Sequence, residues 1–347
     1  HDARHGRVFY ARLRGDREAK LRALEAACVR DLAFEPLALE RPLSRFVPRP
    51  ATHATYASWP SLAEWMPFHR EGVQTNRDRL AIDPDREVLL GRLRAFASGQ
   101  SIPELAGTYA EQFHFSADLA RRNVAAALER DPAGQLGISV RRIAYRQFDA
   151  RWFCPVVPLC HRPRPELAQA IDLAPEVLVS VRKDRGASPY THFGAADVTI
   201  DNCFLSARSS CRARAFPVRA PSGEENLSPE LRDRCAERLG VEITASAFAR
   251  YALAILAADS FRQRFDAELH ADYPRLQIPH SRQEWEALVA IGSRLWALWT
   301  DAIAAESFAA PDAVIAAREP AQLRCSDLRI DLARGGVFAG SQLWVAC

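Results

Sequence analysis

Several features that would place this 347-residue sequence in a known class are absent. It has no run of about 18 apolar residues, so we expect no membrane-spanning helix and no membrane partner. The longest apolar helical stretch, residues 245–258, is interrupted by Ser246 and Arg250. The eight cysteines include no C-x-x-C pair, which argues against a structural zinc site. Scattered thiols of this kind are typical of the reducing cytoplasm, which is the expected location.

Motifs that carry common enzyme chemistry are also missing. There is no G-x-x-x-x-G-K-[ST] phosphate loop, no G-x-G-x-x-G, no G-x-S-x-G and no H-E-x-x-H. A metal-dependent nuclease of the D…[DE]-x-K type needs a lysine, and the sequence has only Lys20 and Lys183. Only Glu18 stands two positions before a lysine, and a helix expected there makes Glu18 and Lys20 a surface pair. We therefore identify no catalytic residue and no metal ligand in this chain.

Charge is distributed unevenly along a sequence whose formal net charge is only +3. Residues 137–220 contain 13 Arg or Lys and 7 Asp or Glu, a balance of +6, whereas residues 221–310 contain 9 and 14, a balance of −5. With 48% hydrophobic and 26% charged residues the chain is typical of globular proteins of one or two domains. A basic middle followed by an acidic part fits an anionic partner on one face, and it also fits an ordinary two-part protein.

The most distinctive stretch is residues 145–166, in which arginines alternate with aromatic residues and then with prolines. Proline fixes its own φ and keeps the preceding residue out of the α region, so we expect Arg162 and Arg164 to be presented from an extended backbone. Their guanidinium groups can bind phosphate, carboxylate or the edge of guanine. The alternative is that four charged residues pair with one another to hold a loop on a sheet: Asp149, Arg151, Arg162 and Glu166.

A polar loop, Gly72-Val-Gln-Thr-Asn-Arg-Asp, precedes a strand expected at residues 80–82. Polar loops on a rigid scaffold are common recognition sites. Gln and Asn can bind adenine through two hydrogen bonds, and Arg can bind guanine in the same way. Gln74, Asn76 and Arg77 are therefore candidate base readers, with a capped turn as the alternative.

A basic turn, Arg182-Lys183-Asp-Arg185-Gly, is expected between two strands. Basic turns of this kind bind DNA phosphates, which position a protein on the duplex without reading its sequence. Arg182, Lys183 and Arg185 are candidate phosphate contacts, and a solvated turn explains them equally well.

Apolar periodicity and turn residues predict an α/β (α+β) fold. A mixed sheet of four or five strands with flanking helices is followed by a mainly helical C-terminal part. We expect strands at residues 7–13, 80–82, 138–148, 176–182, 191–205 and 211–218. Helices are expected at residues 17–28, 56–68 (an aromatic core plug), 83–98, 116–130, 164–171, 229–239, 245–257, 260–271 and 283–307, with a closing hairpin within 324–346.

Taken in order, these segments resemble the single-polypeptide (type ISP) restriction–modification enzymes. Tyr145-Arg-Gln-Phe-Asp-Ala-Arg is similar to the Y-R-P-F-D-x-R motif of their C-terminal specificity domain, and His161-Arg-Pro-Arg is similar to its H-R-P-R segment. Residues 8–21 resemble the end of the methyltransferase domain. Further landmarks follow the family's order: Trp59-Pro-Ser-Leu, the polar loop from Gly72, Asp201-Asn-Cys, and segments within residues 250–275.

This sequence departs from the family pattern at two places. Gln147 stands where the family usually has proline, and Phe153-Cys154 replaces a tyrosine pair. If those aromatic positions touch DNA or pack the recognition loop, the DNA sequence that is chosen could differ.

The resemblance implies a DNA target-recognition domain whose partner is double-stranded DNA. Residues 1–40 would be the tail of a methyltransferase domain, 41–220 the target-recognition α/β domain, and 221–347 a helical part with the closing hairpin. Because the sequence starts at His1 without methionine, we interpret it as a fragment. The resemblance implies that its parent protein is an adenine-specific DNA methyltransferase. S-adenosylmethionine and the N-P-P-Y loop for a flipped adenine would belong to the upstream domain of the same polypeptide. No cofactor is expected in this chain.

The candidate site residues under this hypothesis fall into two groups. The base readers are Gln74, Asn76, Arg77, Arg151, Arg162 and Arg164. The phosphate contacts are Arg182, Lys183 and Arg185. A second hypothesis makes the chain a protein-interaction module, in which the acidic helical half docks a nuclease or helicase partner and the basic loops are structural.

Overall fold

The structure is a computed structural model, and it describes residues 7–13, 15–37, 54–107, 115–183, 190–207, 212–300, 328–331, 336–339 and 342–346. The chain forms two compact units, His1–Pro60 and Ser61–Cys347. The sequence placed domain boundaries at residues 40 and 220. Those boundaries stay a prediction. One core cluster of the second unit combines residues on both sides of 220.

The first unit contains little buried surface. Strands β1 (Val8–Tyr10) and β2 (Glu35–Leu37) pair antiparallel. Helix α1 (Arg17–Ala26) begins as expected after Asp16, whose carboxylate accepts the Ala19 N–H at 2.7 Å. None of its residues is buried. A 3-10 turn (Val29–Asp31) and the short helix α2 (Ala54–Ala57) are also part of this unit.

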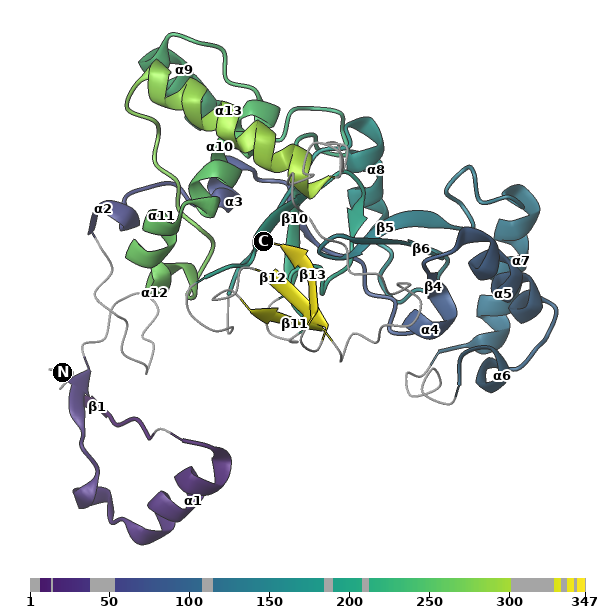
Figure 1. Ribbon diagram of the computed structural model, residues 1–347, viewed down its shortest axis with the longest axis horizontal. Helices are drawn as coiled ribbons and strands as arrows, with labels where there is room; N and C mark the ends of the chain where they lie inside the picture. The colour runs from purple at the N-terminus through teal and green to yellow at the C-terminus, as the bar shows by residue number, and fades with distance from the viewer. Residues whose placement is uncertain are drawn as a thin grey trace, which may run out of the picture. The chain divides into compact units, whose positions relative to one another are not determined.

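In the second unit, the first sheet has the strand order β3 (Arg70–Glu71), β10 (Ala213–Pro217), β7 (Val177–Val181) and β8 (Phe193–Ala196), and all neighbours are antiparallel. Helices α10 (Ala245–Ala257) and α13 (Arg282–Trp299) pack on each other and on this sheet (Figure 1). The short helix α3 (Leu62–Trp65) inserts Trp65 against Phe248, with ring centroids 4.4 Å apart. Trp65 and its neighbour Met66 are fully buried in the core, as the predicted plug requires. The single helix expected at 56–68 was wrong, because only the short helices α2 and α3 are present there.

The second sheet has the order β4 (Ile82–Asp83), β6 (Asp149–Phe153), β5 (Arg141–Arg146) and β9 (Thr199–Ile200), and its β5–β9 pair is parallel. Helices α5 (Arg86–Ala97) and α7 (Ala117–Arg130) pack together, with α5 on β4 and β6 (Figure 1). Two short helices, α4 (Asp78–Ala81) and α6 (Ile102–Ala106), complete this part. Helix α8 (Pro165–Leu173) contacts β10 of the first sheet and β9 of the second, and so joins the two sheets.

The predicted α/β class with mixed sheets and flanking helices is confirmed, but several predicted elements were wrong in detail. The strands divide into two sheets rather than one. The strand expected at 138–148 is half of a hairpin, because the chain reverses at Gln147 and Phe148. The strand expected at 80–82 is mostly helix α4. Helix α5 begins at Asp85 instead of Asp83, and Asp83 forms an ion pair with Arg92.

The remaining helices follow the predicted order. Helix α9 (Pro229–Leu239) has the predicted bounds, and the helix expected at 260–271 is divided into α11 (Asp259–Arg264) and α12 (Asp266–Leu269). The closing hairpin is present as β11 (Leu328–Asp331) and β12 (Gly336–Ala339), and β13 (Gln342–Ala346) adds a third antiparallel strand. Among the described residues, no helix combines the length and the apolar character needed to span a membrane.

Candidate nucleic-acid interface

Three loops that are far apart in the sequence are joined through their backbones. Gln74 and Arg162 form an antiparallel bridge, with N–H to O distances of 3.1 and 2.9 Å. Val73 forms a parallel bridge with Asp201, in which the Asn202 N–H donates to the Val73 carbonyl at 2.8 Å. A Cβ at Gly72 would lie 2.5 Å from the Asp201 backbone, so this close approach requires glycine. Residues 72–79 are thus held between the loop that contains Arg162 and the loop that begins at Asp201.

Arg77, a predicted base reader, has a buried side chain that connects two of these loops. It is only 4% exposed. Its Nη1 donates to the carbonyl oxygens of Pro158 (3.1 Å) and Leu159 (3.0 Å), and its guanidinium carbon lies 3.8 Å from the centroid of the Phe115 ring. The guanidinium therefore ties the polar loop to the proline loop.

Tyr145 is aimed into the same region by a β-bulge. Ala144 faces Ala150 and Arg146 faces Asp149, so Tyr145 is an extra residue on β5. Its hydroxyl donates to Asp78 at 2.8 Å, and Asp78 also accepts the hydroxyl of Thr75. Burial, together with the charge of Asp78, raises the pKa of Tyr145 to about 12. The phenol is therefore a hydrogen-bond donor at neutral pH, and it fixes the start of helix α4.

A buried carboxylate, Asp201, lies beside Tyr145. Its side chain is 4% exposed, and it accepts hydrogen bonds from Arg146 Nη1 and from the Cys203 N–H, both at 2.8 Å. Burial raises the pKa of Asp201 to about 6, although the two donors act in the opposite direction. The Arg146 guanidinium also lies over the Tyr145 ring, 3.8 Å from its centroid. The hairpin is in this way tied to the loop that begins at Asp201.

Arg164, another predicted base reader, turns towards a carboxylate of the first sheet. It lies 3.1 Å from Glu71, which also contacts Arg214 at 2.9 Å and Arg212 at 3.5 Å. The backbone of Arg164 is left-handed, with φ 57°, rather than extended as expected. The proline that follows excludes the right-handed helical region but leaves this one open. Three arginines around one carboxylate leave this edge of the sheet positively charged.

The alternative in which four charged residues pair with one another is right for one pair. Arg151 forms a forked contact with Asp149, with Nε at 2.9 Å and Nη2 at 2.7 Å. Glu166 pairs with Arg70 of β3 instead, at 2.8 Å. The Arg162 side chain is exposed and makes no hydrogen bond or ion pair with another described residue. Arg151 therefore shapes the hairpin, whereas Arg162 is available.

Two of these loops, residues 72–79 and the loop that begins at Asp201, line a polar pocket with a volume of about 660 Å³. Its lining comes from residues 74–79, from Tyr145 and Arg146 of the hairpin, from residues 201–203, and from Ala207 and Arg212. The amides of Gln74, Asn76 and Asn202 make no side-chain hydrogen bond with the rest of the described chain. The rim of this polar pocket therefore offers unsatisfied amide groups beside cationic side chains, which is the composition that base edges require.

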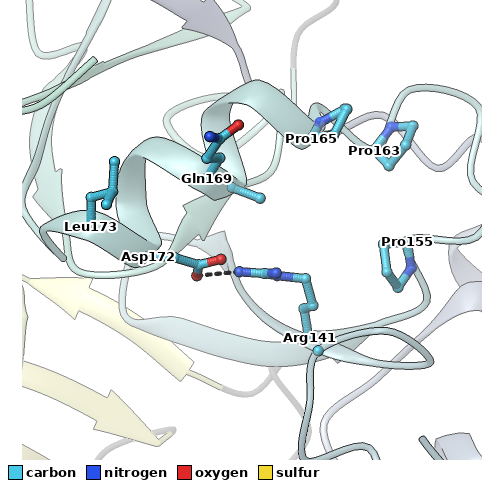
Figure 2. Close-up of a pocket in the computed structure, with 9 residues that line it drawn as sticks. Arg141, Pro155, Pro163, Pro165, Gln169, Asp172 and Leu173 are labelled. Atoms are coloured by element: carbon cyan, nitrogen blue, oxygen red, sulfur yellow. Dashed lines mark hydrogen bonds and ion pairs between the residues drawn. The ribbon is translucent and has the colours of Figure 1, made fainter. Parts of the chain in front are cut away.

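A second pocket, of about 440 Å³, lies on another side of the proline loop. Figure 2 shows Pro155, Pro163 and Pro165 along it, with the ion pair between Arg141 and Asp172 on one side. The prolines of the Arg162-Pro-Arg-Pro segment thus line this proline pocket, and they fix the backbone that presents Arg162.

The predicted residues are brought together in part. Gln74, Asn76, Arg77, Arg151, Arg162 and Arg164 all belong to the joined loops or to the adjoining hairpin. Of the phosphate candidates, Arg182 is exposed and pairs with Asp272 at 3.3 Å, Lys183 is exposed, and Arg185 lies outside the described residues. Phe153 and Cys154, the departure from the family's tyrosine pair, are fully buried and so belong to the packing of the second sheet.

Residue types alone did not single out Asn202 and Arg212, which also line the polar pocket. Asn202 lies within the Asp201-Asn-Cys landmark of the resemblance, so that landmark was the available signal. Arg212 belongs to no recognised motif. It reaches the pocket because it precedes β10, whose residue Arg214 pairs with Glu71 of β3.

Comparison with known proteins identifies the family of this chain. Residues 64–329 match the family described as the Type ISP C-terminal specificity domain. Because the match covers most of the chain, this protein belongs to that family. No curated protein sequence matches it.

Solved structures show the same fold at low sequence identity. A nuclease-deletion mutant of the Type ISP restriction–modification enzyme LlaGI, in complex with a DNA substrate mimic, has a TM-score of 0.58 and 16% identity over 86% of this chain. The DrdV–DNA complex gives 0.55 and 14% over 82%. The ATP-dependent Type ISP enzyme LlaBIII bound to DNA gives 0.52 and 12% over 77%. This chain spans only 24, 29 and 18% of those chains, respectively.

Proposed function

We propose that this chain recognises a specific sequence in double-stranded DNA on behalf of a site-specific DNA adenine methyltransferase. The observation that carries the proposal is the joining of three distant loops, backbone to backbone, beside one polar pocket. Uncommitted amides line this pocket, and the exposed Arg162 lies on the loop that is bridged to Gln74. Membership of a specificity-domain family and the fold shared with three DNA-bound proteins support it.

The groups best suited to base edges are Gln74, Asn76, Asn202 and Arg162. A carboxamide matches the N6 and N7 of adenine, and a guanidinium matches the O6 and N7 of guanine. Each such contact supplies roughly 1–3 kcal/mol of discrimination against the wrong base. The sequence-based candidates Arg77, Arg151 and Arg164 act in our proposal as positioning residues, because their guanidinium groups are engaged with carbonyl oxygens or carboxylates.

The test uses the 347-residue chain and a duplex selected from a random library for binding to it. Arg162→Ala is expected to weaken binding to the selected duplex by roughly 5- to 150-fold and binding to a random duplex far less. Arg122→Ala is the matched control, because Arg122 is an exposed arginine of α7 outside the polar pocket. An equal loss on both duplexes would make Arg162 a phosphate contact.

Arg182, Lys183 and Arg185 are the proposed phosphate contacts. Each neutralised phosphate contributes about −0.9 to the slope of log K against log salt concentration. A steep slope for the whole chain supports DNA binding. A flat slope, with no duplex selected, would favour the alternative in which the acidic helices dock a nuclease or helicase partner.

The first unit gives a separate reason to propose an upstream methyltransferase domain. In the described part of this unit, a two-stranded ribbon, helix α1 and two short helical turns provide little to build a core. The apolar residues Phe9, Leu21 and Leu24 are 52, 47 and 51% exposed. We propose that this unit completes the upstream domain, which would hold S-adenosylmethionine and the adenine pocket. An in-frame N-P-P-Y codon run upstream of His1 supports this, and a stop codon or an unrelated domain there would refute it.

A further inference from the structure

The hairpin between β5 and β6 reverses through a strained residue. Its two turn residues are Gln147 and Phe148, and Phe148 has φ 58°. A positive φ is easy for glycine and tolerable for asparagine, but it is rare for a bulky side chain. Strained residues of this kind persist where the surroundings enforce them, and they concentrate at functional sites. Glycine would form this turn more easily, so the presence of phenylalanine indicates that the ring itself is used.

The Phe148 ring is exposed and yet rigidly backed. The residue is 67% exposed, one of the largest values for an apolar residue among the described part of the chain. Its ring stacks on Trp299 of α13, with centroids 5.0 Å apart and an interplanar angle of 16°. The Trp299 ring in turn lies 3.0 Å from where a Cβ would stand on Gly194, and 6.2 Å from the centroid of Phe204. Trp299 therefore supports the ring from behind and leaves Phe148 projecting into solvent.

The position of Phe148 links it to the polar pocket. Tyr145 and Arg146, which precede the turn, line that pocket, and so does Cys203, the residue before Phe204. The guanidinium groups of Arg146 and Arg151 flank the turn, and both lie over the Tyr145 ring. An exposed aromatic ring thus lies two residues beyond the pocket-lining Arg146, next to cationic side chains that attract a phosphate backbone.

We propose that Phe148 is a wedge that inserts between two neighbouring base pairs of the bound duplex, beside the bases that contact the polar pocket. This inference rests on the proposed function. Apolar side chains on DNA-binding surfaces unstack a base step in this way, and the bent duplex then covers more protein surface. The stack of Phe148 on Trp299 resists displacement of the ring when the bases close on it.

A wedge also contributes to sequence choice without any hydrogen bond. Pyrimidine–purine steps such as TA and CA unstack more easily than other steps. The selected duplex should therefore carry such a step at a fixed distance from the bases contacted by Gln74 and Asn76. Phe148→Ala should relax the preference at that step only.

The experiment places 2-aminopurine, whose fluorescence rises when it is unstacked, at successive positions of the selected duplex. With the unmodified chain, fluorescence should rise at one step on binding. Phe148→Ala and Phe148→Gly should abolish that rise and weaken binding by roughly 5- to 150-fold. The glycine variant accepts φ 58° without strain, so it keeps the test valid if the alanine variant folds poorly.

Leu136→Ala is the matched control. Leu136 is an apolar residue with similar exposure, 69%, and it precedes the opposite end of β5, roughly 20 Å from the tip. It should leave both fluorescence and affinity unchanged. Tight binding by the unmodified chain without a rise at any position, or a rise that survives in both Phe148 variants, would overturn the wedge and leave the proposed function intact. Failure of the unmodified chain to bind any duplex would refute the proposed function itself.

Discussion

The two four-stranded sheets of the second unit use their side chains in different ways. In the first sheet, all five residues of β7 are buried, and four of the five in β10 are. In the second sheet, β5 buries only Ile143 and Ala144, and its remaining four residues are arginines and a tyrosine that reach solvent or the polar pocket. One sheet is a packed core layer, whereas the other is a platform that presents polar groups.

This difference explains where the molecule keeps its unfavourable features. The left-handed Phe148 is in the hairpin of the second sheet, and the buried carboxylate Asp201 directly follows β9 of that sheet. The left-handed Arg164 precedes α8, which contacts both sheets. Each one lowers stability, and each persists because the surrounding structure is stable enough to hold it. The first sheet and helices α10 and α13 provide that stability through an apolar core that runs from Leu62 to Trp296.

The largest expected effect comes from removing the same residue type from each sheet. Phe216 of β10 is fully buried, and its ring contacts those of His69 and Tyr273. Phe216→Ala should lower the free energy of unfolding by about 3–5 kcal/mol. Phe148→Ala should lower it by about 1 kcal/mol or less, because it loses one stacking contact and little buried area. Urea denaturation measures both, and equal losses would contradict the division of roles between the sheets.

The sequence predicted the first sheet's surroundings well, because buried helices carry strong apolar periodicity. The bounds of α9 and α10 were predicted residue for residue. The hairpin of the second sheet was missed for a physical reason. Its turn contains neither glycine, asparagine nor proline, so Gln147 and Phe148 carry no turn signal, and Phe148 adopts its conformation only because tertiary contacts impose it.

The candidate site was predicted in composition but not in role. Residue types identified Gln74, Arg77 and Arg162 as candidate base readers, and the structure brings their loops together. Sequence could not tell that Arg77 is buried while Arg162 is exposed, because that depends on which carbonyl oxygens the folded proline loop offers to Arg77.

The next effect sharpens the comparison through pH. The native pKa of Asp201, about 6, lies above its ordinary value of 3.8, so the native carboxyl keeps its proton where the unfolded chain has lost it. Its contribution to stability is present below about pH 4 and is lost as the pH rises through 6, by about 3 kcal/mol. Because asparagine does not titrate, the stability of the unmodified chain minus that of Asp201→Asn should fall by nearly this amount between about pH 3 and pH 8.

The stability of the unmodified chain has to be compared with that of Asp201→Asn, because His69 changes stability with pH in the opposite direction. Burial lowers the pKa of His69 to about 4, so its contribution increases as the pH rises from 4 to 6.5. His69 is present in both proteins, and its effect cancels in the difference. A difference that stays constant with pH would mean that Asp201 titrates normally and is not a buried charge.

A smaller effect is expected from Arg77→Lys. The lysine keeps the charge but lacks the planar guanidinium, whose Nη1 reaches the carbonyl oxygens of Pro158 and Leu159 while its carbon lies over the Phe115 ring. Loss of such a charged hydrogen bond should lower the free energy of unfolding by about 2 kcal/mol. Because the loop that carries Gln74 and Asn76 then loosens, binding to the selected duplex should also weaken. Arg122→Lys, an exposed exchange on α7, should change neither property, and an equal response of the two variants would contradict a positioning role for Arg77.

The smallest effect on stability tests whether the basic turn is used for binding at all. Arg182 and Asp272 form an ion pair in which both side chains are more than half exposed, at 57 and 60%. Such pairs contribute little, so Arg182→Ala should change the free energy of unfolding by about 0.5 kcal/mol or less. If Arg182 contacts a phosphate, the salt dependence of DNA binding should become less steep by about 0.9. An unchanged slope would leave Arg182 as a surface ion pair. The proposed DNA contacts would then be limited to the second sheet and the loops beside it.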